Sequence, residues 1–184
     1  MPQAPFMFSN AAEWESWLAA NHSSAPEIWL KIAKKGSGAT SVTLADALDT
    51  ALCYGWIDSH RKALDDSFYL QRYSPRSPKG FWSKVNVAKA EALIAAGRMR
   101  PSGLAAIDAA RRDGRWDGAY EAQSAVTVPD DLRAALEDNP SAQAAFDQLG
   151  KTDRYLLILR LLKARTSAAR VAALRSVLTR LADG

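Results

Sequence analysis

Apolar residues recur at the helical period near the start of the chain. Trp14 and Leu18 stand four residues apart with a further tryptophan between them, which predicts a helix with one apolar face. Ser9 or Asn10 can cap this helix, because a short polar side chain accepts a hydrogen bond from a free backbone N–H group of the first turn. The pattern predicts a first helix that ends near residue 21.

After Pro26, the pattern of apolar residues changes to a period of two. Between residues 27 and 35, apolar side chains alternate with Trp, Lys and Ala, which predicts a strand. A helix is predicted over residues 41–54, and Gly55 is placed to end it in the left-handed region that glycine favours. Residues 56–60 and 67–73 then predict a β-hairpin around an acidic turn.

The second half of the chain has a helical pattern, with glycine and proline at the ends of the apolar segments. The predicted helices cover residues 83–96, 102–112, 130–137, 141–149, 151–165 and 167–182. The predicted fold class is α+β, with a small antiparallel sheet and helices over residues 1–80. A helical lobe follows over residues 81–184.

The composition is that of an ordinary globular protein, since 48% of the residues are hydrophobic and 24% are charged. The net charge of +4 allows contact with nucleic acid, anionic lipid or acidic metabolites but requires none of them. The single cysteine, Cys53, excludes an internal disulfide and lies in an apolar run, which predicts a buried, inert thiol.

The sequence contains no long apolar segment. No run approaches the roughly 18 to 20 apolar residues of a membrane span, and the N-terminus lacks the basic start and apolar core of a signal peptide. We therefore expect a cytoplasmic protein.

Large aromatic and cationic side chains concentrate between Gly55 and Asn86. Indole rings and guanidinium groups together can form an anion-binding or base-stacking surface. A helix start beside arginines is also a natural phosphate or carboxylate site. The candidate ligand-binding residues are Trp56, Asp58, Arg72, Arg76, Trp82, Ser83 and Asn86.

Each of these candidates also has a structural interpretation. Asp58 should point to the same side of its strand as Trp56, where it could accept hydrogen bonds or act as a general base. It could equally form an ion pair with Arg61 that holds the hairpin. Arg72 and Arg76 could clamp an anion bidentately. Asn86 follows Ser83 by three residues in the first turn of the next helix. The two side chains could bind an anion, or they could only cap that helix.

Familiar catalytic signatures are absent from the sequence. It lacks the nucleophile elbow, the phosphate-binding loop, the dinucleotide fingerprint and the zinc-protease helix. One cysteine and two distant histidines make a conventional zinc site unexpected. No metal and no cofactor are therefore expected.

The C-terminal helices carry a basic stripe of eight lysines and arginines from Lys151 onward. A solvated outer face accounts for such a stripe. Nucleic-acid binding is the alternative, and it is less favoured because aromatic residues are scarce there.

The order of these motifs resembles the YdeI/OmpD-associated family, also described as bacteriocin-protection proteins. The resemblance extends over nearly the whole chain and includes Gly97, Met99, Gly103 and a C-terminal Lys163–Arg170 segment. Its motifs are Trp17-Leu18, Glu27-Ile28-Trp29-Leu30, Lys34-Lys35, Ala47-Leu48-Asp49, Gly55-Trp56-Ile57-Asp58, Arg72-Tyr73-Ser74-Pro75-Arg76, Trp82-Ser83, Asn86 and Gly114-Arg115-Trp116.

This resemblance implies a YjbR/CyaY-like α+β fold for the N-terminal half and a helical C-terminal half. It also implies a link to antimicrobial-peptide tolerance, and for one member a link to an outer-membrane porin. The family pattern defines no catalytic residues. The absence of a signal peptide argues against direct contact between this chain and a periplasmic porin.

The leading hypothesis is a non-enzymatic stress-protection protein that binds a small anionic ligand or a protein partner through the region from Trp56 to Asn86. One alternative is an uncharacterised enzyme that acts on a small carboxylate or phosphate substrate, with Asp58 as its acid or base. A second alternative is nucleic-acid binding through the basic C-terminal helices.

Overall fold

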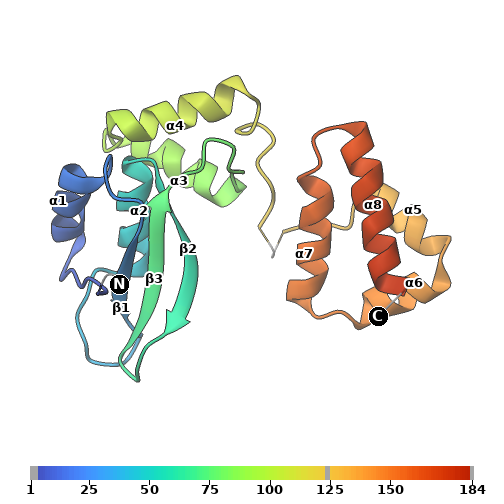
Figure 1. Cartoon of the computed structure of the whole chain (residues 1–184), viewed down its shortest axis with the longest axis horizontal. Helices are drawn as coiled ribbons and strands as arrows, with labels where there is room; N and C mark the ends of the chain where they lie inside the picture. Colours follow the sequence, from blue (N-terminus) through green and yellow to red (C-terminus); the bar gives the residue numbers. More distant parts are fainter. Residues whose placement is uncertain (1–3, 123–124, 183–184) are drawn as a thin grey trace. The chain divides into compact units, whose positions relative to one another are not determined.

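The computed structural model describes residues 4–122 and 125–182. Its elements group into two compact units, coloured by sequence in Figure 1. The first unit contains residues 1–80 and 86–118, and the second contains residues 81–85 and 119–184. The sequence assigned residues 86–118 to the helical lobe, whereas in the structure they group with the sheet.

The first unit begins with a capped helix and contains most of the regular elements. The side chain of Asn10 accepts from the backbone N–H of Glu13 at 3.0 Å, so Asn10 is the cap of α1. The elements of this unit are α1 (Ala11–Asn21), β1 (Ile28–Ala33), α2 (Leu44–Cys53), β2 (Trp56–Ala63), β3 (Phe68–Pro75), most of α3 (Lys84–Ala95) and α4 (Pro101–Arg112).

The three strands form an antiparallel sheet in the order β1-β3-β2. The predicted hairpin joins β2 to β3, and the Asp65 carboxylate closes its turn by accepting from the backbone N–H groups of Ser67 and Phe68. Because β3 is central, its residue Tyr73 pairs with Ile28 on one side and with Asp58 on the other.

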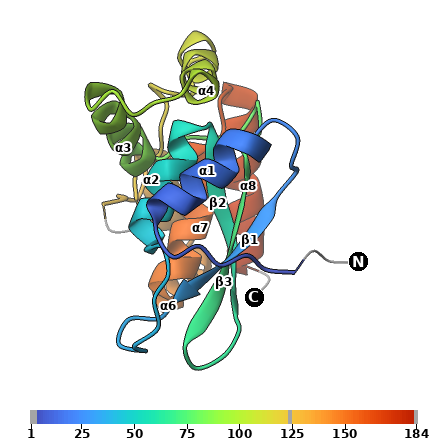
Figure 2. The same ribbon diagram turned by 90° about the vertical axis from the view of Figure 1, so that its left-hand side faces the viewer.

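Helices α1 and α2 pack on one face of this sheet, as Figure 2 shows with α1 in front. The ring of Trp14 in α1 lies 5.6 Å from that of Tyr73, and its indole N–H donates to the carbonyl of Ala47 in α2 at 3.0 Å. The buried residues Ile28 and Leu30 of β1 point into this layer. We call this side of the sheet the covered face.

Helix α2 begins at Leu44, three residues later than predicted. Ser41 is unavailable for the helix because its hydroxyl accepts from the backbone N–H of Ala33 at 2.8 Å, and Thr43 serves as the cap instead. At the other end, Gly55 has a φ of +76°, as predicted. A side chain there would also approach the Ser102 carbonyl oxygen to 2.9 Å, so the α2–β2 turn requires glycine.

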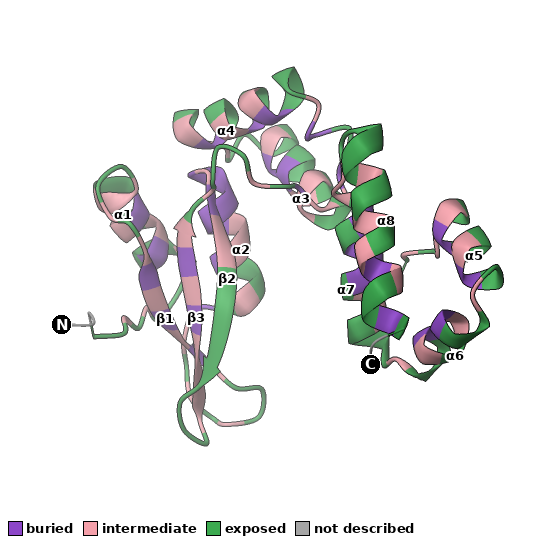
Figure 3. Cartoon of the chain, turned by 45° about the vertical axis from the view of Figure 1, so that its right-hand side comes forward, coloured by how far each residue is buried: buried purple, intermediate pink, exposed green. Residues whose placement is uncertain are grey.

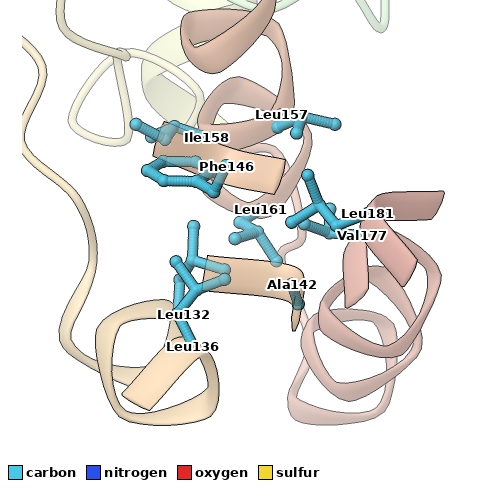
Figure 4. Packing of buried hydrophobic residues seen from close by; sticks show 9 residues of the cluster. All are labelled: Leu132, Leu136, Ala142, Phe146, Leu157, Ile158, Leu161, Val177 and Leu181. Carbon is cyan, nitrogen blue, oxygen red and sulfur yellow. The ribbon is translucent and has the colours of Figure 1, made fainter. Parts of the chain in front are cut away.

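The second unit is a helical bundle around one apolar core. Figure 4 shows its side chains, among them Phe146 and Leu161. Its helices are α5 (Asp130–Glu137), α6 (Pro140–Gln148), α7 (Lys151–Leu162) and α8 (Ser167–Ala182). Together with the small antiparallel sheet, this bundle confirms the predicted α+β class.

Candidate functional site

Trp56 is part of the core of the first unit. Only 1% of the residue is exposed. Its indole N–H donates to the carbonyl of His22 at 3.1 Å, and its ring meets that of Trp17 edge-on at 5.9 Å. The ring therefore supports the covered face and is not available to stack on a ligand.

Asp58 lies on the covered face, directly opposite Tyr73 on the neighbouring strand. Partial burial raises the pKa of the Asp58 carboxyl, and its own backbone N–H together with Arg61 and Arg76 opposes that shift. Tyr73 is fully buried, and its hydroxyl finds no hydrogen-bond partner within the described residues. Burial, and then the nearby Asp58, raises the pKa of Tyr73 as well.

Arg76 lies at the end of the β2–β3 pair that carries Asp58. It follows β3 directly, and its backbone N–H donates to the carbonyl of Gly55 at 2.9 Å. Its positive charge offsets part of the rise in the pKa of Asp58 that burial causes. The structure thus pairs Asp58 with Tyr73 and places the charge of Arg76 near enough to affect Asp58.

Arg72 lies on the opposite face. It precedes Tyr73 in β3, and successive side chains of a strand point to opposite sides of a sheet. Its Nε and Nη2 atoms donate to the same oxygen of Glu27, with Nε at 2.8 Å, and its Nη1 atom donates to the Ser59 hydroxyl at 3.3 Å. The structure therefore separates Arg72 from Asp58 by the thickness of the sheet.

The ion pair with Arg72 also affects Glu27. The hydrogen bond from Arg72 is the main cause that holds the pKa of Glu27 below its ordinary value. The side chain of Arg72 is 27% exposed and that of Glu27 is 40% exposed. The guanidinium group is thus held in a fixed orientation by hydrogen bonds while the side chain remains partly exposed to solvent.

The remaining predicted residues lie at the start of α3. Trp82 is buried, and its carbonyl accepts from the backbone N–H of Tyr120 at 3.0 Å. Ser83 forms an isolated β-bridge with Tyr120, and both Trp82 and Ser83 belong to the second unit. Asn86 lies in the first turn of α3 and belongs to the first unit.

The face that carries Arg72 has a second set of aromatic and cationic side chains. We call it the open face and define it by Trp29, Lys31, Lys62, Phe68 and Arg72, all of them half-exposed or exposed. Figure 3 shows the exposed stretch of β2 that contributes Lys62. The sequence contained the signal for this face, because Ile28, Leu30 and Ile32 alternate with Trp29 and Lys31.

The C-terminal motif of the second unit has a structural role. Arg170 in α8 donates from Nε and Nη2 to the two carboxylate oxygens of Asp131 in α5, at 2.7 and 2.8 Å. Thr166 caps α8 through the backbone N–H of Ala169. The ammonium group of Lys163 lies over the ring of Phe81 at 5.3 Å. The Arg170–Asp131 pair thus joins α8 to α5, and the other two contacts hold the ends of the α7–α8 connection.

Other basic residues of this stripe are exposed: Arg160, Arg175 and Arg180 on the helices, and Arg165 in the connection between α7 and α8. Within the described ranges, no group of three or more His, Cys, Asp or Glu side chains could hold a metal ion. None of the helices in the described part of the chain combines the length and apolar character needed to cross a membrane.

The fold defines a two-unit α+β protein with a sheet whose two faces differ in chemistry. Residues 6–106, more than half of the chain, match the family described as "Domain of unknown function (DUF8412)", and the chain belongs to that family. Residues 125–184 match the family described as "Bacteriocin-protection, YdeI or OmpD-Associated". Neither a curated protein nor a solved structure matched the chain.

The second match supports the YdeI/OmpD-associated resemblance for the C-terminal part of the chain. The first match gives no support for a YjbR/CyaY-like N-terminal half, which stays a prediction.

Proposed function

We propose that this protein is a non-catalytic protective protein of the YdeI/OmpD-associated type, and that it acts by binding an anionic partner through the open face. The match of residues 125–184 to the bacteriocin-protection family supports the first part of this proposal. The distribution of charge on the sheet supports the second part. The binding surface differs from the one expected from sequence, since it retains Arg72 but not Trp56 or Asp58.

One observation carries the proposal: three cations lie on the open face against one carboxylate. Lys31, Lys62 and Arg72 come from three different strands, and among the described residues Glu27 is the carboxylate that forms an ion pair with one of them. A guanidinium group that is already oriented loses little side-chain freedom when it binds an anion. The open face therefore suits a negatively charged partner better than a neutral one.

The proposal is tested by thermal melts with inorganic phosphate, polyphosphate and heparin as probes. A ligand that binds only the folded protein raises the melting temperature by mass action, so at least one probe should stabilise the wild type. Arg72→Lys should reduce that shift, because Lys lacks the planar two-donor fork. Arg175→Lys, an exposed arginine of α8, is the matched control and should leave the shift unchanged.

Glu27→Gln sharpens the same test. It removes the carboxylate that competes for Arg72, so a binding face should show a larger stabilisation by the anion than the wild type does. If Arg72 is only an ion-paired support, Glu27→Gln lowers stability and no probe stabilises any variant. That result would exclude the open face as an anion site.

A second candidate function rests on Asp58. A carboxyl whose pKa is raised by burial, opposite a buried tyrosine and near enough to a cation to be affected by it, resembles the acid–base groups of enzymes. In that case it would act on a small carboxylate or phosphate substrate held by Arg76. Asp58→Asn would then abolish turnover of such a substrate while its binding survives.

A further inference from the structure

Two aromatic rings lie on the open face, and each has a lysine ammonium group over it. Lys62 Nζ lies 4.5 Å from the centre of the Trp29 ring, and Lys31 Nζ lies 4.7 Å from the centre of the Phe68 ring. The indole N–H of Trp29 donates to Glu27 at 3.2 Å, which fixes the edge of that ring. Both rings are half-exposed.

The strand pairing shows that the two rings lie apart along the direction of β1. Trp29 is paired with Arg72, and Phe68 is paired with Ala33, four residues further along β1. Four residues of a strand extend over roughly 13 Å. The two rings therefore form two separate stacking positions on one surface, with cations beside both of them.

We propose that the open face binds single-stranded nucleic acid, with unpaired bases stacked on Trp29 and Phe68 and phosphates bound by Lys31, Lys62 and Arg72. This inference rests on the proposed function, because it names the class of the anionic partner. Single-strand-binding surfaces combine aromatic rings with a cationic track, since every base has a π-face and every nucleotide a phosphate. The lysines can leave the rings for the phosphates because their stems are flexible.

The two rings favour a single strand over a duplex. In a duplex the bases are stacked on each other, so a protein reaches only their edges and the phosphates. Half-exposed rings within a sheet would gain nothing there beyond the lysine contacts. In a single strand, the unpaired bases can stack on the rings while the phosphates contact the cations of the open face.

The experiment measures the fluorescence anisotropy of a labelled oligothymidylate of about 12 nucleotides, within the range that one single-strand-binding module covers. The full chain should bind it. Trp29→Ala should weaken binding about 5- to 100-fold, and Trp29→Phe should restore most of it. Lys62→Ala should lower the slope of log affinity against log salt by about 0.7.

Two controls separate stacking from charge. Heparin carries negative charge but no bases, so Trp29→Ala should leave its binding unchanged. Phe81→Ala removes a ring of the second unit that also lies under a lysine, and it should leave oligonucleotide affinity unchanged. If Trp29→Ala does not fold, Trp29→Leu replaces it, because leucine keeps apolar bulk without a π-face.

The possible outcomes decide between the two proposals. If heparin and the oligonucleotide bind equally and Trp29→Ala affects neither, the face recognises charge alone. The nucleic-acid inference is then wrong, while the proposed function stands. Binding to vesicles of anionic lipid without binding to the oligonucleotide would overturn the inference in the same way. If neither inorganic phosphate nor any polyanion binds, both proposals fail.

Discussion

The two faces of the sheet show how differently adjacent residues of one strand can be used. On the covered face, Tyr73 is fully buried and the pKa of its partner Asp58 is raised by burial. On the open face, Arg72 is accessible and lowers the pKa of Glu27. Neighbouring residues of one strand therefore lie in two environments. Burial on the covered face disfavours the charged form of a carboxyl, whereas the ion pair on the open face favours it.

The largest expected effect is a difference in unfolding free energy between tryptophan variants on the two faces. Trp56→Ala removes a ring that is 1% exposed, together with its hydrogen bond to His22, and should lower the free energy of unfolding by about 3 to 5 kcal/mol. Trp29→Ala on the open face should cost about 1 kcal/mol. Denaturant unfolding of both variants measures the difference, and equal losses would contradict the distinction between the faces.

Close packing behind the covered face predicts the next largest effect. Gly103 in α4 lies against α2, and a side chain there would fall 2.2 Å from the Cys53 carbonyl oxygen. Gly103→Ala should therefore destabilise the first unit by about 2 to 3 kcal/mol, although alanine favours helices. Ala105→Gly, at an exposed position of the same helix, is the control and should cost about 1 kcal/mol.

The two carboxylates should respond to pH with opposite signs. Asp58 has a raised pKa, so the folded state holds its proton more tightly and loses stability as the pH rises from 3.8 through the folded pKa. Glu27 has a lowered pKa, so its contribution is present above 4.5 and is lost as the pH falls through the folded pKa.

Melting temperatures of matched variants across this pH range test the signs. Asp58→Asn should gain stability over the wild type as the pH rises, whereas Glu27→Gln should lose it. The effect for Glu27 should be small, because exposed ion pairs contribute little. The same trend in both variants would contradict the assignment of these residues to different environments.

The smallest effect is expected for cations outside the sheet. Arg175 and Arg180 are exposed on α8. Changing both to Glu should alter the free energy of unfolding by less than about 0.5 kcal/mol and leave anion binding unchanged. A loss of nucleic-acid binding in this double variant would transfer that function from the open face to the C-terminal helices.

The local elements were predictable because their signals lie within a few residues. The cap at Asn10 and the left-handed Gly55 each satisfy backbone groups of the neighbouring turn. The start of α2 was predicted too early, because Ser41 bonds to Ala33, a residue eight positions away that no local pattern includes.

The candidate site was only partly predictable. Residue types between Gly55 and Asn86 indicated stacking and anion binding, but they could not show that Trp56 supports the core. The pleat of β3 decided that Arg72 and Asp58 lie on opposite faces, since the pairing of Asp58 with Tyr73 places both next to the helices. Trp29 and Lys31 were visible as alternating positions, yet their partners Arg72 and Leu70 are about forty residues away.

By itself, the sequence determined the helices, the strands and the α+β class, because periodicity and capping act over one or two turns of chain. Only the tertiary structure decided the strand order β1-β3-β2 and, with it, which side chains share a face. Strand order depends on pairing between residues far apart in the chain, and the burial of one face by α1 and α2 then settles where charge is tolerated. That long-range choice left Trp29, Lys62 and Arg72 together on the open face.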